Sequence, residues 1–276
     1  MIRLIAFDLD GTMLRKNSEL SAANRKALED AAEKGVLPVP ATGRLLSFMP
    51  ENLMDLPQVR YLVCSNGAMV YDRQEETVLA SDLIPTELAV QVMEVCDRFG
   101  VYYEFYDRGE AVTVTDNVRL GEEVYHFPPD RLRFLKKNYK AKVPDLKAYL
   151  RENHICPEKI NSQFIPPEIR PQLIAALRKL GEMEIASSYP DTMEINAPGV
   201  CKARGLERLC ALLGIDRQDV MAMGDGENDE PMLRWAGTSV AMGNAGESTK
   251  AAARYVTDDV DSDGAARAIQ RFVLQK

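Results

Sequence analysis

The chain has 276 residues, a length that favours two domains over a single core. Hydrophobic residues make up 46% and charged residues 28%, as in a globular protein, and the formal net charge of −8 argues against a nucleic-acid partner. Only two histidines, His126 and His154, are present, which argues against a histidine phosphatase and against a zinc site built on several histidines.

No run of about 18 apolar residues occurs, and Asp8 and Asp10 interrupt any secretory hydrophobic segment. We therefore expect a cytoplasmic protein with no membrane partner. The five cysteines are dispersed and odd in number, so we interpret them as buried thiols in a reducing compartment.

The first predicted element is a buried strand over residues 2–7, which ends in Asp8-Leu9-Asp10-Gly11-Thr12. An apolar run that ends in carboxylates and glycine is typical of a parallel strand that delivers its carboxyl end to a site. Residues two apart on a strand project to the same side, so Asp8 and Asp10 can address one substrate together. The pair alone is weak evidence, because aspartate and glycine also suit turns.

A capped helix is predicted next, over residues 21–35, and is followed by a strand over residues 36–40. Pro38 and Pro40 lie two apart, so they remove two backbone donors on the same side of this strand. We expect that side to face an edge, a bulge or a loop, while the strand still places Thr42. Strands and helices then alternate to about residue 71, the pattern of parallel α/β units.

From about residue 84 to residue 187 the sequence changes character and predicts an inserted α+β domain. Its expected helices cover residues 85–100, 145–152 and 167–180, and its expected strands cover 101–105, 111–115 and 159–164. Residues 182–187 and 192–195 are expected to return the chain to the core. The predicted domains are therefore a core over 1–83 and 188–276 and an insertion over 84–187.

A basic segment lies within the insertion, between Asp130 and Arg151. Its basic residues are Arg131, Arg133, Lys136, Lys137, Lys140, Lys142, Lys147 and Arg151. Such a segment can draw an anionic substrate toward a site. A solvated face is the favoured interpretation, because runs of charge usually have that role.

Three further polar motifs occur along the chain. They are Ala41-Thr42-Gly43-Arg44, Pro198-Gly199-Val200-Cys201-Lys202 and Gly224-Asp225-Gly226-Glu227-Asn228-Asp229. Each has a plainer explanation when taken singly: Asp229 with Pro231 fits a helix start, and Lys202 fits a solvated lysine. Their order, and their places beside apolar or helix-patterned runs, favour one shared site.

The residue types suit phosphoryl transfer, which needs a nucleophile, cations and positioned donors around a charged phosphoryl group. Asp8 can attack phosphorus to give an aspartyl phosphate. Asp10 can protonate the leaving alkoxide and then take a proton from the attacking water. Thr42 and the amides around Gly11 and Gly43 can donate hydrogen bonds to phosphate oxygens.

Positive charge is also required at such a site. Lys202 supplies a compact cation that offsets the repulsion between Asp8 and a phosphate dianion. Without a further cation, Asp8, Asp10, Asp225 and Asp229 would repel one another and the substrate. Oxygen-only ligands beside a phosphate point to Mg²⁺.

With these motifs in this order, the chain resembles the haloacid dehalogenase superfamily, and within it the Cof-type (class IIB) phosphatases. Further matches are Ser65-Asn66-Gly67-Ala68 and Val240-Ala241-Met242-Gly243-Asn244-Ala245. The resemblance runs from residue 2 to about residue 245. It implies an α/β fold, with a doubly wound parallel-sheet (Rossmann-like) core and an inserted α+β cap domain that sets substrate specificity.

The resemblance also implies roles for single residues. Asp8, Asp225 and the backbone carbonyl of Asp10 would be direct Mg²⁺ ligands, with Asn228 and Asp229 holding metal-bound waters or Lys202. The candidate phosphate-binding residues are Gly11, Thr12, Gly43, Arg44, Asn66 and Gly67.

These observations predict an Mg²⁺-dependent phosphatase that hydrolyses a small phosphorylated metabolite, such as a sugar phosphate or a phosphorylated cofactor. A phosphohexomutase of the same superfamily is the alternative, and a non-catalytic phosphate-sensing module is a third possibility. Substrate discrimination is expected from Arg44 and Asn66 and, in the insertion, from Tyr106, Arg108 and Lys159. A monomer and a dimer both remain open.

Overall fold

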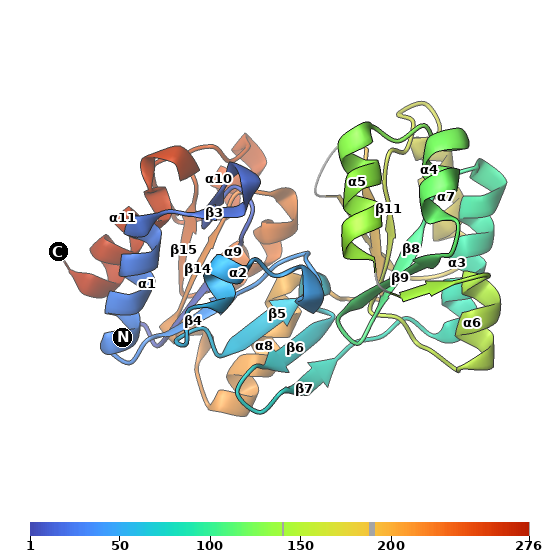
Figure 1. Cartoon of the computed structure of the whole chain (residues 1–276). Helices are drawn as coiled ribbons and strands as arrows, with labels where there is room; N and C mark the ends of the chain where they lie inside the picture. The colour runs from blue at the N-terminus through green and yellow to red at the C-terminus, as the bar shows by residue number, and fades with distance from the viewer. Residues whose placement is uncertain (140, 188–190, 276) are drawn as a thin grey trace. The chain divides into compact units, whose positions relative to one another are not determined.

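A computed structural model describes residues 1–139, 141–187 and 191–275, and it divides into two compact units (Figure 1). The first comprises Met1–Arg44, Phe48–Ser81 and Val200–Lys276, and we call it the core unit. The second comprises Leu45–Ser47 and Asp82–Gly199, and we call it the inserted unit. Lys140 of the basic segment and the predicted boundary at residue 188 lie outside the described residues.

The core unit is built on a five-stranded parallel sheet in the order β16-β15-β14-β1-β4. Its strands are β1 (Leu4–Phe7), β4 (Leu37–Pro40), β14 (Val220–Gly224), β15 (Thr238–Ala241) and β16 (Tyr255–Val256). After β1, the next strand of the sheet, β4, lies on one side of β1. After β14, which lies on the other side of β1, β15 and β16 follow outward in order. The strand order therefore reverses between β1 and β14, which confirms the predicted doubly wound core.

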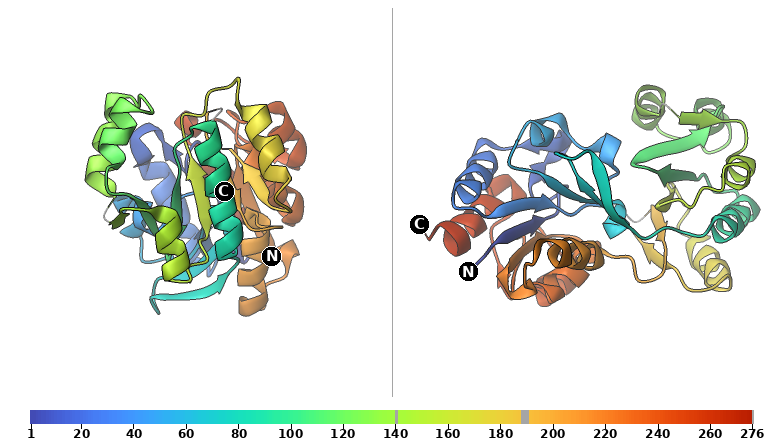
Figure 2. Two further views of the ribbon diagram at one scale, coloured as in Figure 1. Left: turned by 90° about the vertical axis from the view of Figure 1, so that its right-hand side faces the viewer. Right: turned by 90° about the horizontal axis from the view of Figure 1, so that it is seen from below.

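Helices cover both faces of this sheet (Figures 1 and 2). On one face α1 (Ala22–Glu33) packs against α11 (Gly264–Ile269). On the other, α8 (Lys202–Leu213) and α9 (Glu230–Trp235) share a buried cluster with Leu4 and Ala6 of β1, and α10 (Glu247–Ala252) packs beside α9. No helix within the described ranges is long and apolar enough to cross a bilayer.

The predicted first helix is confirmed as α1. The Ser21 side chain accepts a hydrogen bond from the Asn24 amide at 3.1 Å, the usual N-cap arrangement. The buried face consists of Asn24, Ala27, Leu28 and Ala31.

The proline-containing strand lies where its sequence requires. β4 is the edge strand of the parallel sheet, and it pairs with β1 through Leu37, Val39 and Ala41, whose amides face β1. Pro38 and Pro40 therefore present their nitrogens to the outer side, which confirms the prediction. The neighbouring β5 (Tyr61–Cys64) packs beside β4, and its bridge to this chain lies beyond the strand, between Ala41 and Val63.

The prediction of parallel units up to residue 71 is wrong after β5. β5, β6 (Met69–Asp72) and β7 (Thr77–Ser81) form an antiparallel three-stranded sheet. Ser65 and Asn66 both have left-handed backbone angles, with φ of 53° and 63°, and so turn the chain back on itself. The helix between β4 and β5 is the short α2 (Glu51–Met54), and β2 (Leu14–Arg15) pairs with β3 (Glu19–Leu20).

The inserted unit contains a six-stranded sheet in the order β10-β9-β8-β11-β13-β12. The strands are β8 (Glu104–Asp107), β9 (Glu110–Val114), β10 (Ala141–Val143), β11 (Lys159–Ser162), β12 (Glu184–Ala186) and β13 (Met193–Asn196). The helices are α3 (Thr86–Phe99), α4 (Asn117–Glu123), α5 (Pro129–Asn138), α6 (Leu146–Glu152) and α7 (Arg170–Arg178). All six elements that the sequence predicted here are present, whereas α4, α5 and β10 were not predicted.

The return of the chain to the core comes later than expected. Residues 182–187 and 192–195 were expected to lead back to the core, but β12 and β13 belong to the sheet of the inserted unit. β13 pairs antiparallel with β11, and β12 pairs antiparallel with β13. These backbone hydrogen bonds hold both strands in the inserted unit, which ends at Gly199.

The basic segment makes ion pairs inside its own unit. Arg131 is buried against Glu104, Lys147 pairs with Asp97, and Arg151 pairs with Glu87. The remaining described basic residues are exposed: Arg133, Lys136, Lys137 and Lys142. This distribution favours a structural and solvated role for the segment.

Candidate active site

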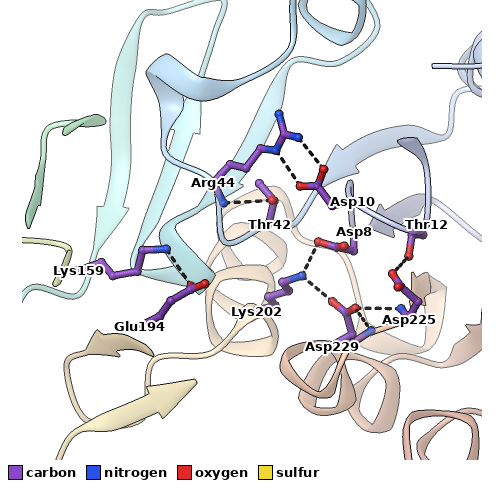
Figure 3. Close-up of polar contacts among 11 residues, drawn as sticks. Asp8, Asp10, Thr12, Thr42, Arg44, Lys159, Glu194, Lys202, Asp225 and Asp229 are labelled. Atoms are coloured by element: carbon purple, nitrogen blue, oxygen red, sulfur yellow. Dashed lines mark hydrogen bonds and ion pairs between the residues drawn. The ribbon is translucent and has the colours of Figure 1, made fainter. Parts of the chain in front are cut away.

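Polar residues gather where three neighbouring core strands end (Figure 3). Asp8 follows β1, Thr42 lies two residues after β4, and Asp225 follows β14. Carboxyl ends of parallel strands share one edge of the sheet, and the reversal of strand order between β1 and β14 leaves room above it. The fold thus brings together residues that are more than 200 positions apart in the sequence.

Lys202, the first residue of α8, links two of the carboxylates. Its Nζ donates to Asp8 Oδ1 at 2.5 Å and to Asp229 Oδ1 at 2.6 Å. The side chains of Lys202 and Asp229 are both fully buried, and that of Asp8 is 11% exposed. A buried ammonium is tolerable only with such partners, so the solvated interpretation of Lys202 is excluded.

Asp229 is a structural partner on both of its oxygens. While Oδ1 accepts from Lys202, Oδ2 accepts from the backbone amides of Asp225 at 3.0 Å and Gly226 at 2.9 Å. This arrangement closes the turn after β14 and fixes the direction of the Asp225 side chain. Of the two roles that the resemblance offered for Asp229, the geometry fits the holding of Lys202. Asn228 lies half-buried in the same turn.

Asp225 is held from the opposite side by the loop after β1. The Thr12 hydroxyl donates to Asp225 Oδ1 at 2.6 Å, and the Asn244 amide donates to Asp225 Oδ2 at 3.2 Å and to the Gly11 carbonyl at 2.9 Å. Gly11 has φ of 84°, and a Cβ there would lie 2.3 Å from Asp225 Oδ2. Only glycine allows this close approach.

Asn244 belongs to one of the motifs that carry the family resemblance, but the sequence did not predict a role for it. Its position after β15, the strand beside β14, is the signal that could have identified it. A polar residue just beyond the carboxyl end of a neighbouring parallel strand reaches the same edge of the sheet.

Burial and the crowding of carboxylates change the pKa values at this site. Burial raises the pKa of Asp8 to about 8, although Lys202 opposes the shift, and Asp229 and Asp225 add to it. Burial likewise raises the pKa of Asp225 to about 6, against the hydrogen bond from Thr12. Burial alone would lower the pKa of Lys202, but Asp229 and Asp8 raise it above its usual value, so this lysine stays charged.

The carboxylates form a group suited to a cation. Asp8, Asp225 and Asp229 each offer one oxygen, and these atoms all lie within 4.8 Å of one another. Only oxygen donors are present in this group, which fits a hard divalent ion such as Mg²⁺. Burial and the neighbouring carboxylates raise the pKa values of Asp8 and Asp225, and a bound cation would favour their ionised forms.

The Thr42 loop joins this cluster to the turn after β5. The Asn66 amide donates to the Thr42 carbonyl at 3.0 Å, and Thr42 Oγ1 accepts from the Arg44 amide at 3.1 Å. Gly67 has φ of 100°, and a Cβ there would lie 2.1 Å from the carbonyl oxygen of Cys201, the residue before Lys202. Three residues that the sequence predicted for the site therefore lie on loops that contact one another or the start of α8: Thr42, Asn66 and Gly67.

Asp10 and Arg44 form an ion pair (Figure 3). Arg44 Nε donates to Asp10 Oδ2 at 2.8 Å, and Arg44 Nη2 donates to Asp10 Oδ1 at 2.5 Å. The Asp10 side chain is 46% exposed and that of Arg44 is 23% exposed. The sequence placed both residues at the site but did not predict that they pair.

Two of the three candidates in the inserted unit lie together. Lys159 Nζ pairs with Glu194 at 2.8 Å and lies 4.8 Å from the centre of the Tyr106 ring. Lys159, Glu194 and Tyr106 are all buried. Arg108, in contrast, is exposed in the turn between β8 and β9.

Comparison with known proteins agrees with the fold and the motifs. Residues 5–269 match the family model of the haloacid dehalogenase-like hydrolases. The chain belongs to this family. Its resemblance to haloacid dehalogenase-like phosphatases is therefore confirmed, and the protein is a hydrolase of phosphate monoesters.

Several curated members of the family are similar over most of their length. The 5-amino-6-(5-phospho-D-ribitylamino)uracil phosphatase YcsE of Bacillus subtilis is 32% identical, with 99% of this chain and 96% of that protein covered. The HMP-PP phosphatase of Cronobacter sakazakii is 30% identical, with 89% and 85% covered. The pyridoxal phosphate phosphatase YbhA of Escherichia coli is 28% identical, with 99% of each covered.

Solved structures of the family share the whole fold. BT4131, described as a sugar phosphatase of haloacid dehalogenase subclass IIB, superposes with a TM-score of 0.80 at 28% identity, and 98% of each chain is covered. TM0651 from Thermotoga maritima gives a TM-score of 0.76 at 26% identity, with 99% of this chain and 98% of that chain covered.

Proposed function

We propose that this protein is an Mg²⁺-dependent phosphatase of small phosphorylated metabolites that works through an aspartyl phosphate on Asp8. The observation that carries the proposal is the buried Lys202, which donates to both Asp8 and Asp229 at the reversal point of the sheet. Such a lysine holds the Asp8 carboxylate in one place and lowers its repulsion of a phosphate dianion.

The reaction needs two displacements at phosphorus. A carboxylate oxygen of Asp8 forms a bond to phosphorus as the bond to the ester oxygen breaks, and Asp10 gives its proton to the departing alkoxide. Water then attacks the aspartyl phosphate and loses a proton to Asp10, which frees phosphate and restores the Asp8 carboxylate. Thr42 and the amides of Gly11 and Gly43 donate to the phosphoryl oxygens.

Asp8, Asp225 and the carbonyl of Asp10 would hold Mg²⁺, with Asn228 near its waters. When bound, the ion neutralises negative charge on the phosphoryl oxygens and on the crowded carboxylates. Thr12 and Asn244 support this arrangement, because each fixes one oxygen of Asp225.

The substrate class follows from the relatives. Their names include phosphatases of a ribitylamino-uracil phosphate and of pyridoxal phosphate, and a sugar phosphatase. We propose that this chain acts on a small metabolite of the same kind and that the inserted unit, with Lys159 and Tyr106, selects it. The core residues would bind only phosphate and metal, which every such substrate shares.

A screen of phosphate monoesters with purified protein tests this function. We expect phosphate release with Mg²⁺ from at least one hexose phosphate or phosphorylated cofactor, and loss of release when EDTA is added. Conversion of a hexose phosphate to its isomer without phosphate release would instead identify a mutase. No turnover of any ester with Mg²⁺ would favour a phosphate-sensing module.

A further inference from the structure

We infer that Arg44 is a positioning residue that holds the acid/base Asp10 and is itself supported by the segment Leu45–Ser47 that follows it. The inference rests on the proposed function, because it concerns the group that protonates the leaving alcohol. The sequence expected Arg44 to bind phosphate, but the contacts of its guanidinium point to a different role.

At least four of the five guanidinium N–H donors of Arg44 are engaged by protein groups. Two hold the carboxylate of Asp10 in a fork, one reaches Ser18 Oγ at 2.8 Å, and one reaches the Phe48 carbonyl at 3.2 Å. A phosphate could be held in a fork by this guanidinium only if it displaced at least one of these partners.

The fork fixes direction more than it adds stability. The Asp10 side chain is 46% exposed, and a pair in such a setting contributes little to folding. Two parallel N–H···O bonds nevertheless set both the position and the plane of a carboxylate. That constraint matters for a general acid, because proton transfer requires hydrogen-bond distance to the leaving oxygen.

Arg44 is also the last residue of the core unit before the chain enters the inserted unit. Leu45–Ser47 belong to the inserted unit, and Phe48 belongs to the core again. The hydrogen bond from Arg44 Nη1 to the Phe48 carbonyl closes the base of this three-residue excursion.

The excursion is anchored on the turn between β8 and β9. The Ser47 amide donates to the Gly109 carbonyl at 3.0 Å. Leu46 packs so closely that a Cβ added to Gly109 would lie 2.6 Å from Leu46 Cβ. Leu45–Ser47 is therefore held on this turn, and one peptide bond joins the segment to Arg44.

The dependence on the leaving group tests the role of Arg44. We compare kcat/KM, which reports the steps up to departure of the alcohol, for 4-nitrophenyl phosphate and for the best alkyl phosphate in the screen. Arg44→Met should lower kcat/KM on the order of 100-fold for the alkyl ester but only a few-fold for the aryl ester, since 4-nitrophenolate leaves without a proton. Arg44→Lys, which keeps the charge without the fork, should show the same pattern.

A double-mutant cycle sharpens this test. If Arg44 acts through Asp10, the double variant Arg44→Met/Asp10→Asn should be no slower than Asp10→Asn alone on the alkyl ester. Equal losses on both esters, weaker inhibition by inorganic phosphate, or additive losses in the double variant would make Arg44 a phosphate ligand and overturn the inference.

Gly109→Ala tests whether the segment Leu45–Ser47 supports Arg44. The added methyl group must push Leu46 away, so we expect a several-fold loss that is larger for the alkyl ester. Gly100→Ala is the matched control, because Gly100 also has a left-handed backbone (φ 64°, against 76° at Gly109) but faces open space. A Gly109→Ala enzyme with the wild-type ratio of the two rates would show that Leu45–Ser47 does not support Arg44.

The two levels of the proposal fail in different ways. If wild-type protein with Mg²⁺ releases phosphate from neither ester, the proposed function fails, and this inference fails with it. If wild-type protein is active but the Arg44 variants lose both activities equally, only the inference fails.

Discussion

Asp8 combines a raised pKa with a fixed position, because burial and Lys202 act on the same carboxylate. Asp8→Asn keeps the size and the planar shape of this side chain but removes the nucleophile. We expect phosphate release to fall to less than a few per cent of the wild-type rate, with a nearly unchanged melting temperature. Phosphate release at a substantial fraction of the wild-type rate would contradict the covalent mechanism.

Lys202 should matter for stability as well as for activity. Lys202→Met would leave the buried Asp229 and Asp8 facing each other without a cation, and loss of one partner from a buried pair typically costs about 3–5 kcal/mol. Denaturant unfolding measures this cost. Lys26→Met is the control: it removes a lysine that pairs with Asp30 on the surface of α1, and it should leave the unfolding midpoint unchanged within error.

Protons and Mg²⁺ should compete for the same carboxylates. Without metal, Asp225 holds its proton below about pH 6 and Asp8 below about pH 8. These protons must leave before the oxygens bind the ion, so Mg²⁺ affinity should rise between about pH 5 and pH 9. Calorimetric titrations at several pH values measure this dependence. Asp225→Asn should weaken binding and flatten the lower part of the curve, whereas pH-independent affinity would count against both ligands.

Among the structural elements, the turn between β5 and β6 has the least tolerance for change. Gly67→Ala would place a methyl group against the Cys201 carbonyl and strain a left-handed backbone, so it should reduce both stability and activity. Gly35→Ala carries similar backbone strain (φ 78°) but meets no atom within 4 Å, so it should cost about 1–2 kcal/mol from strain alone and leave activity unaffected. Equal effects of the two substitutions on thermal unfolding and turnover would show that the contact with Cys201 is unimportant.

Elements with strong local signals were predictable. Ser21 ahead of α1, the turn at Arg108 and Gly109, and Asp145 before α6 each mark a boundary through their own chemistry. α4 and α5 lack side-chain N-caps, and the one start signal of α5, Pro129 in its first turn, was not recognised. β13 was wrongly predicted to belong to the core. An alternating strand fits any sheet, and only the pairing of β13 with β11 shows that it belongs to the sheet of the inserted unit.

The sequence likewise predicted part of the candidate site: the identity of its main residues, but not all of their contacts. The acids, Thr42 and Lys202 were found because each accompanies a predicted strand or helix. The fork between Arg44 and Asp10 and the role of Asn244 depend on which strands are neighbours, and a single sequence does not contain that information.

At the scale of the whole molecule, the revised boundary changes how substrate selection can be tested. A deletion of residues 84–187 would leave β13 without its partner β11, so Asp82–Gly199 is the segment to remove and replace with a Gly/Ser linker. If the remaining core folds, as circular dichroism can check, it should still bind phosphate and Mg²⁺ but lose discrimination among phosphate esters. A core that kept the parent's ranking of substrates would place selection in loops such as those at Arg44 and Asn66.

The pairing of β1 with β14 also has a consequence for synthesis of the protein. Leu4 lies opposite Val220, so the centre of the core sheet cannot form until most of the chain has left the ribosome. Most of the inserted unit is a continuous stretch, Asp82–Gly199, whose strands pair within it, and we expect it to fold first. Asp8 then meets Lys202 only at the end, so the nascent chain carries no assembled nucleophile while it is still being made.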